Sequence, residues 1–154
     1  MGTLAECVQP LATPAASEAT AGAADSGGCL APFAAKLYQT FLSLMKDDDD
    51  EDVRNNAVFG LGELAMHGGP ATQAHYPDML QALSSLVQRE ESPKVVDQVV
   101  AAVCRMIVAR PDLVPLPSVL PVVFAQLPLK EDYEEYPIVY RDARYDQNDG
   151  PEVA

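Results

Sequence analysis

The sequence predicts an all-α protein built as a solenoid of stacked helix pairs, and two observations lead to this prediction. A block that begins at Met45-Lys46 returns at a constant offset, as Val87-Gln88 and again as Leu129-Lys130. Between these points apolar residues recur at three- and four-residue steps, the spacing of one face of an α-helix. Repeats of this length are typical of two-helix units that bury their apolar faces against their neighbours.

The first helix is expected over residues 32–46, where five apolar side chains follow one face. These side chains are Phe33, Leu37, Phe41, Leu44 and Met45. The acidic run of residues 47–52 then connects this helix to the next and favours the start of that helix, because carboxylates stabilise a helix N-terminus.

The second helix, expected over residues 53–67, is apolar on more than one side, which predicts that it lies between other helices. Gly60 and Gly62 each lower its helix propensity by about 1 kcal/mol relative to alanine. We therefore expect a neighbouring helix to approach closely there. Gly68-Gly69-Pro70 ends the helix and opens a loop.

Two further helices repeat this alternation. A half-exposed helix is expected over residues 76–88, with Pro77 in its first turn, followed by a largely apolar helix over 93–109 with Ser92 as its N-cap. The second of these should lie alongside the helix of residues 53–67, one layer further along the solenoid.

The last helices are expected over residues 118–128, with Ser118 as cap and Pro121 in the first turn, and over 133–141. The domain organisation is thus a helical segment over 29–141, with about two complete helix pairs and partial repeats beside them. Residues 1–28 are rich in Ala, Gly, Ser and Thr and residues 142–154 are polar, so we expect both to be disordered.

Charge and composition exclude several classes of function. The formal net charge of −13 disfavours direct nucleic-acid binding and favours basic proteins as partners. The prolines in the apolar stretch of residues 113–129 argue against a membrane span. Three separated cysteines, Cys7, Cys29 and Cys104, and the lack of a secretory leader fit a reduced intracellular location.

Two segments resemble the C-terminal HEAT repeats of importin-beta-type nuclear transport receptors. They are Glu51-Asp52-Val53-Arg54-Asn55-Asn56-Ala57-Val58-Phe59-Gly60-Leu61-Gly62-Glu63-Leu64 and Leu127-Pro128-Leu129-Lys130-Glu131-Asp132-Tyr133-Glu134-Glu135. The resemblance covers about residues 32–141 and implies a HEAT-repeat α-solenoid that is one piece of a longer receptor.

The resemblance also implies a function and partners. Receptors of this family carry basic cargo such as ribosomal proteins or histones through the nuclear pore, contact nucleoporins, and release cargo when the GTPase Ran binds. Their Ran site lies mainly in N-terminal repeats, which this sequence does not contain. The implied location is the cytoplasm and the nucleus. The alternatives are a HEAT scaffold of another complex, such as a phosphatase regulatory subunit, and a truncated product without function.

Ten acidic residues are the candidate contacts for basic cargo. They are Asp47, Asp48, Asp49, Asp50, Glu51, Asp52, Glu131, Asp132, Glu134 and Glu135. For the first six, a solvated loop that caps a helix is the favoured explanation, and both explanations can hold together.

Other motifs favour structural roles. His67 and His75 have no third ligand nearby, so we expect no metal site, and Cys104 lies on an apolar helix face. No constellation of residues supports catalysis or a bound cofactor, and we expect a non-enzymatic binding module. Two apolar stripes are either core or slots for the Phe-Gly repeats of pore proteins. They are Met79, Leu80, Leu83 and Val87, and Leu120, Val123 and Phe124.

Overall fold

A computed structural model describes residues 30–47 and 49–143 of the 154-residue chain, and every regular element in those ranges is helical. The α-helices are α2 (Ala34–Asp47), α3 (Glu51–His67), α4 (Pro70–Gln73), α5 (Tyr76–Arg89), α6 (Pro93–Ala109), α7 (Leu116–Gln126) and α8 (Tyr136–Ala143). Two 3₁₀ turns, η2 (Pro111–Leu113) and η3 (Tyr133–Glu135), precede α7 and α8.

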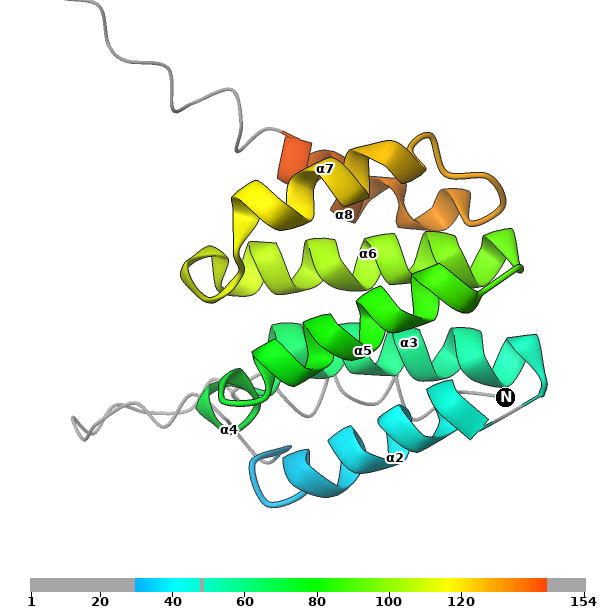
Figure 1. Ribbon diagram of the computed structural model, residues 1–154. Helices are drawn as coiled ribbons and strands as arrows, with labels where there is room; N and C mark the ends of the chain where they lie inside the picture. The colour runs from blue at the N-terminus through cyan, green and yellow to red at the C-terminus, as the bar shows by residue number, and fades with distance from the viewer. Residues whose placement is uncertain (1–29, 48, 144–154) are drawn as a thin grey trace, which may run out of the picture.

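The helices form two layers (Figure 1). An outer layer contains α2, α5 and α7, and an inner layer contains α3, α6 and α8. The most extensive packing is between α3 and α6, and α6 packs in turn against α8. Equivalent helices of successive repeats therefore lie side by side, which confirms the predicted α-solenoid of HEAT type.

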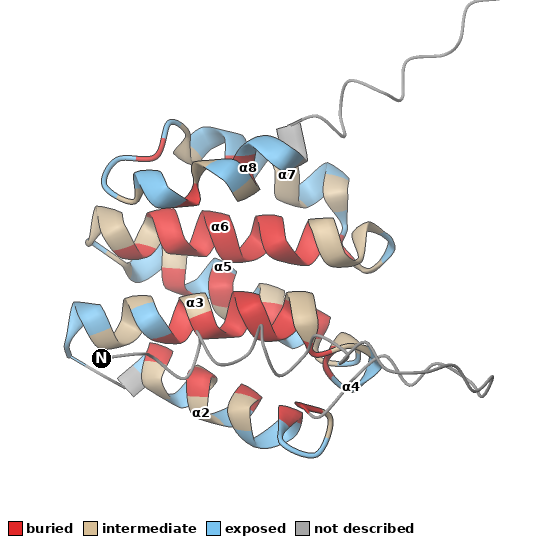
Figure 2. Ribbon diagram, turned by 180° about the vertical axis from the view of Figure 1, so that it is seen from behind, coloured by how far each residue is buried: buried red, intermediate tan, exposed pale blue. Residues whose placement is uncertain are grey.

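The two long helices α3 and α6 form most of the core, and buried residues run along both of them (Figure 2). Each is covered by outer-layer helices on one side and by its inner-layer neighbour on another, as the all-round apolar pattern predicts. Val58, Leu64, Ala101 and Cys104 are all 0 % exposed. By contrast, α5 buries one stripe of four residues, Tyr76, Met79, Leu83 and Leu86.

Two glycines of α3 mark the close approaches expected from the sequence. A Cβ atom added at Gly62 would lie 3.0 Å from the Cα and 3.1 Å from the Cβ of Ala102 on α6. One added at Gly60 would lie 2.6 Å from the ring of Phe41 on α2. Gly60 therefore faces α2, whereas Gly62 faces α6 and lets the backbones of α3 and α6 approach closely.

We predict that Gly62→Val lowers the free energy of unfolding by about 1–3 kcal/mol, because its branched side chain must displace the α6 backbone. Gly62→Ala should change it much less, since a gain of about 1 kcal/mol in helix propensity offsets the tight Cβ contact. Urea unfolding followed by circular dichroism measures both. Ala125→Val on the exposed face of α7 is the matched control, and an equal loss for both valine variants would contradict the close-packing explanation.

Helix starts differ from prediction where a polar cap or a proline decides them. The helix expected from Val53 begins at Glu51, because Oδ1 of Asp50 accepts a 2.8 Å hydrogen bond from the backbone N–H of Asp52. Ser92 does lie at the N-cap position of α6, but its side chain makes no capping hydrogen bond. Its backbone N–H instead donates to Glu90 Oε1 at 3.1 Å.

The C-terminal helices also differ. The helix predicted over 118–128 spans Leu116–Gln126, so Ser118 is not its cap and Pro121 lies inside it. It ends where Leu127 becomes extended before Pro128, the conformation that a residue preceding proline favours. The helix predicted from Tyr133 begins with the turn η3, and α8 follows it.

The loop predicted after Gly69 contains the four-residue helix α4, which the sequence analysis missed because a Gly-Gly-Pro segment reads as a stop. Gly69 itself adopts a φ of 62°, a value that glycine reaches without strain. Nearby, His75 precedes α5 and stacks on Tyr38 of α2 with ring centroids 4.4 Å apart. In the ranges described, no helix is long and apolar enough to cross a bilayer.

Candidate functional site

A chain of buried charges links α3 and α6 to the turn η3, which precedes α8. Arg105 of α6 donates from Nε to Glu63 Oε1 on α3 at 2.6 Å, and from Nη2 to both carboxylate oxygens of Glu135 at 2.9 and 2.7 Å. The three residues are 6 %, 1 % and 8 % exposed, respectively. The guanidinium also lies 4.8 Å from the ring centroid of Phe59. These contacts fix the segment that carries Glu135 against the two long helices.

Polar side chains of α6 hold the acidic segment of residues 130–135 in place. Oδ2 of Asp97 accepts the backbone N–H groups of Lys130, Glu131 and Asp132 at 2.7, 2.7 and 3.0 Å. Nε2 of Gln98 donates to Asp132 Oδ2 at 2.5 Å and to Glu135 Oε1 at 3.0 Å. The turn before α8 is therefore anchored to α6 by hydrogen bonds.

The second acidic cluster, which consists of Glu131, Asp132, Glu134 and Glu135, contains both exposed and buried carboxylates. Glu131 and Glu134 are exposed, as expected for residues that contact a partner. Burial raises the pKa of Asp132, and the neighbouring carboxylates of Glu135, Asp97 and Glu134 add to this rise although the hydrogen bond from Gln98 opposes it. Glu135, by contrast, is buried against Arg105. The prediction that Glu135 is a surface contact for cargo therefore needs correction, because most of its bonding capacity serves the fold.

The first acidic cluster, residues 47–52, also has structural roles. Asp48 lies outside the described residues, as does the side chain of Asp47. Asp50 caps α3, while Glu51 and Asp52 occupy its first turn. Asp49 is exposed beside the basic side chains of Lys46, Arg54 and Arg89. The run is a helix-capping connector with some exposed carboxylates, so both explanations weighed for it retain support.

Basic residues tie this connector to the following repeat. Arg89 of α5 donates from Nη2 to the carbonyl of Met45 at the end of α2, at 2.8 Å. Arg54 of α3 pairs with Glu90 at 2.8 Å, and this hydrogen bond lowers the pKa of the Glu90 carboxyl below its ordinary value. Both contacts hold the ends of the connector against the following repeat, and the two guanidinium groups add positive charge beside it.

A polar pocket of about 380 Å³ lies between the two clusters. Its walls come from α3, through Asn55, Asn56 and Phe59, from α6, and from the acidic segment. Lys94 of α6 lies between the clusters, and the hydrogen bond from its Nζ to Asp52 Oδ1, at 2.6 Å, raises its pKa. The remaining charged groups of the wall are carboxylates, namely Glu131, Asp132, Glu134 and Glu135. The arrangement has the charge and hydrogen-bonding capacity to bind a cation.

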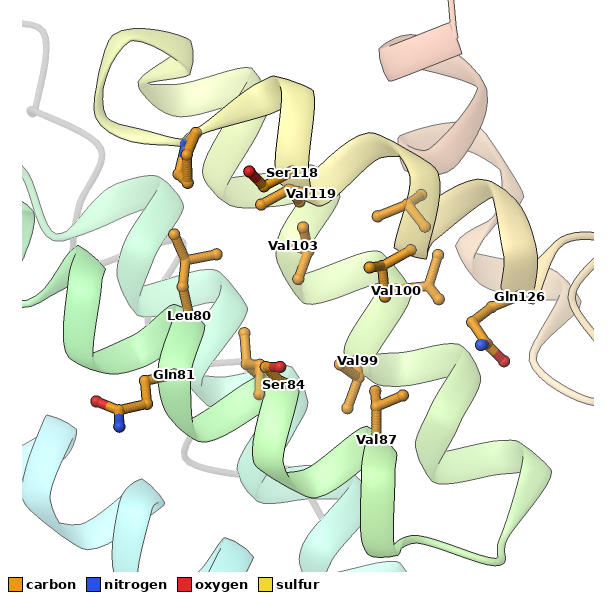
Figure 3. Close-up of a pocket in the computed structure, with 14 residues that line it drawn as sticks. Leu80, Gln81, Ser84, Val87, Val99, Val100, Val103, Ser118, Val119 and Gln126 are labelled. Carbon is orange, nitrogen blue, oxygen red and sulfur yellow. The ribbon is translucent and has the colours of Figure 1, made fainter.

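An apolar groove of about 300 Å³ occupies the other face, between α5, α6 and α7 (Figure 3). Leu80 and Val87 of α5 face Val119 of α7 across it, with Val99, Val100 and Val103 of α6 at its floor. The apolar side chains along α5 thus contribute both to the core and to the wall of this groove. Met79 and Leu83 are buried, whereas Phe124 of α7 is 45 % exposed.

The sequence is similar to importins along almost its whole length. It is 38 % identical to human Importin-4 over 141 residues, which are 92 % of this chain, and 38 % identical to mouse Importin-4 over 136 residues, 88 % of it. A probable importin subunit beta-4 of Schizosaccharomyces pombe is 31 % identical over 111 residues, 72 % of the chain. The chain belongs to the importin-beta family.

The chain spans only a small part of the importin-beta family members it matches. The aligned regions amount to 12 %, 11 % and 10 % of the human, mouse and fission-yeast proteins. No family model matches the sequence. Membership in this family agrees with the helical-repeat fold.

The sequence analysis did not identify the polar residues that hold the acidic segment of residues 130–135 in place. The two inner helices were described as apolar, and their polar residues were given no role. Four of these residues lie buried within the inner layer, namely Glu63, Asp97, Gln98 and Arg105. A signal was present, because the constant repeat offset carries Glu63 onto Arg105 and thereby places opposite charges at equivalent positions of adjacent helices. Opposite charges in register on two buried helices predict an interhelical ion pair.

The remaining motifs of the importin-beta segment occupy structural positions. His67 ends α3 within 3.6 Å of Glu63, and Cys104 is buried in α6. Cys7 and Cys29 lie outside the described residues, as do most residues of both predicted disordered segments. Within the parts of the chain that the structure covers, no group of three or more His, Cys, Asp or Glu residues could hold a metal ion.

Proposed function

We propose that this chain forms part of the cargo-binding surface of a nuclear import receptor and contacts basic proteins through the acidic segment of residues 131–135. The observation that supports this proposal most is the pocket beside that segment, where carboxylates from one turn face amide side chains from α3 and α6. Hydrogen bonds that the backbone of the turn donates to Asp97 of α6 hold the turn in place, so little ordering entropy is lost when a partner binds. Lys-rich segments of ribosomal proteins or histones have complementary charge.

The other partners proposed for the whole receptor are nucleoporins and Ran, with shuttling between cytoplasm and nucleus. Among the described surfaces, the apolar groove between α5 and α7 is the one whose chemistry suits phenylalanine side chains of nucleoporin repeats. The acidic segment lies beside α3 and α6, whereas the groove lies between α5, α6 and α7. A receptor built this way can hold cargo and pore proteins at the same time.

We predict that Glu131→Gln combined with Glu134→Gln weakens binding of a fluorescein-labelled alternating Lys-Gly peptide about tenfold at low ionic strength. Each exposed charge contributes up to about 1 kcal/mol, and tenfold corresponds to about 1.4 kcal/mol. Fluorescence anisotropy with the full chain measures the affinity, and a salt titration should show a shallower slope for the variant.

The matched control removes two acidic charges elsewhere, through Asp78→Asn and Glu91→Gln, which are both exposed. It has the same net charge as the test variant and should retain most of the affinity. A Phe-Gly peptide added as competitor should leave the basic probe bound. Equal weakening in both variants would show that net charge alone attracts the probe, and salt-independent binding would reject electrostatic capture altogether.

A further inference from the structure

The segment between α5 and α6 contains a serine whose hydroxyl does not cap the helix that follows it. Ser92 is partly exposed and lies at the N-cap position of α6, but its side chain makes no capping hydrogen bond. A serine at this position ordinarily accepts a hydrogen bond from the N–H group two or three residues further on, here that of Lys94 or Val95. The first turn of α6 therefore lacks the side-chain acceptor that Ser92 could supply.

The backbone around Ser92 has the extended form in which protein kinases bind a substrate segment. The φ and ψ angles are −82° and 131° at Glu90 and −74° and 116° at Ser92. Pro93 follows directly, and its ring fixes the next φ at about −65° and removes the N–H group. Proline-directed kinases select serine or threonine residues that precede a proline. The sequence contains two such steps, Ser92-Pro93 and Thr13-Pro14, and the second lies outside the described residues.

Two basic side chains lie close to Ser92. Glu90 Oε1 accepts the backbone N–H of Ser92 at 3.1 Å and Nη2 of Arg54 at 3.1 Å, so a single oxygen atom separates Ser92 from a guanidinium of α3. Lys94 follows two residues later and bonds Asp52 at 2.6 Å. A phosphate group carries a charge of about −1.5 to −2 at pH 7 and forms charge-assisted hydrogen bonds at a helix N-terminus or beside arginine. Ser92 offers both surroundings.

We propose that Ser92 is phosphorylated by a proline-directed serine/threonine kinase and that the phosphate links the start of α6 to α3. In the transfer, the serine Oγ attacks the γ-phosphorus of ATP, the bond from that phosphorus to the β,γ-bridging oxygen breaks, and ADP leaves. The hydroxyl proton passes to the catalytic carboxylate of the kinase. The phosphate then accepts the uncapped N–H groups of α6 and competes with Glu90 for Arg54, because it carries more charge than one carboxylate. It competes with Asp52 for Lys94 in the same way.

The modification also strengthens the acidic surface. It adds about two negative charges and leaves the Asp52 carboxylate without Lys94, so a basic partner should bind more tightly. This consequence rests on the proposed function. The modification itself and its effect on the start of α6 do not depend on it.

The test of the site uses the full chain with Thr13→Ala, so that Ser92-Pro93 is the Ser/Thr-Pro step that remains. Incubation with a recombinant mitogen-activated protein kinase, Mg²⁺ and ATP should add a phosphate, which tandem mass spectrometry should locate on Ser92. Pro93→Ala keeps the hydroxyl but removes the proline, and it should slow the incorporation at least about tenfold. Ser118, which is exposed and precedes valine, is the internal control and should stay unmodified. Ser92 without phosphate, or an equal rate in Pro93→Ala, would overturn the proposal.

The effect on the fold is measured by thermal unfolding followed by circular dichroism. The phosphorylated chain should unfold at least about 3 °C above the unmodified chain, and Arg54→Gln should remove about half of this gain. Because the neighbouring cations favour the dianion, the phosphate should titrate at a lower pH in the folded chain than in the urea-unfolded chain, as read by phosphorus NMR. The gain should therefore shrink as the pH falls below about 6. An unchanged or lower midpoint would reject the link between α6 and α3.

The effect on binding is measured with the Lys-Gly peptide, which should bind the phosphorylated chain about threefold more tightly at low ionic strength. An unchanged affinity would reject the regulation by Ser92. Failure of the peptide to bind the unmodified chain would reject the proposed function. In that case a phosphate on Ser92 and a raised midpoint would still support the modification site.

Discussion

Replacing Arg105 by methionine is expected to lower the free energy of unfolding by about 3–5 kcal/mol, the largest loss that we predict for one side chain. Arg105 is the cation between two buried carboxylates, Glu63 and Glu135. Methionine has a similar length and fills much of the same space, so the effect would come mainly from the loss of charge. Two carboxylates would remain 1 % and 8 % exposed without this partner. Urea unfolding followed by circular dichroism measures the loss.

Two further variants test whether unpaired charge is the cause. Adding Glu63→Gln and Glu135→Gln to Arg105→Met should restore a large part of the stability, because the buried carboxylate charges are then removed as well. Arg141→Met, on the exposed surface of α8, removes the same group where no buried carboxylate depends on it and should have little effect. If the triple variant is no more stable than Arg105→Met, the arginine stabilises the fold by packing rather than by compensating charge.

The repeat offset and the apolar period were sufficient to predict the layered helices, because burial alone decides those features. Gly62 is an example of a detail that could also be anticipated. A glycine inside a helix costs stability, so its presence on a buried helix indicates a close neighbour, and Ala102 of α6 is that neighbour. Such predictions work when a single physical effect, here the exclusion of a side chain, determines the outcome.

The polar contacts between repeats could not be predicted in the same way. Glu135 stands among three other acidic residues and reads as a surface charge, but it pairs with Arg105 from another repeat. Which carboxylate of a cluster turns inward depends on the backbone path of the turn, and that path is held by hydrogen bonds to Asp97 of α6. The local sequence does not determine which of these carboxylates comes within hydrogen-bonding distance of Arg105. That this segment contacts cargo stays a prediction, and the burial of Glu135 within it did not follow from its local sequence.

The two acidic clusters illustrate the same limit on a larger scale. They are separate in sequence, yet Lys94 bonds Asp52 of one cluster and lines the pocket with carboxylates of the other. The solenoid brings them together because α3 and α6 stack in register. The acidic surface thus arises from two neighbouring repeats, and its geometry depends on the residues that fix the turn of residues 130–135.

Asp97→Ala is therefore expected to affect both stability and binding. One oxygen of Asp97 accepts three backbone N–H groups, from Lys130, Glu131 and Asp132, and the residue is 1 % exposed. Hydrogen bonds to a charged acceptor contribute about 1.5–3 kcal/mol each, and water can replace part of this at the exposed turn. We expect a loss of about 3 kcal/mol in the free energy of unfolding, measured by urea unfolding.

The binding measurement distinguishes anchoring from simple loss of stability. In Asp97→Ala the backbone of the acidic turn loses its hydrogen bonds to α6, while Gln98 and Arg105 still hold its side chains. The Lys-Gly peptide should therefore bind several-fold more weakly even under conditions where the variant is fully folded. Asp97→Asn keeps an acceptor oxygen but loses the charge, and both effects should be about half as large. Asp78→Ala on the exposed face of α5 removes a carboxylate without touching the turn and is the control. Unchanged peptide affinity in a folded Asp97→Ala variant would mean that partners do not depend on the geometry of this turn.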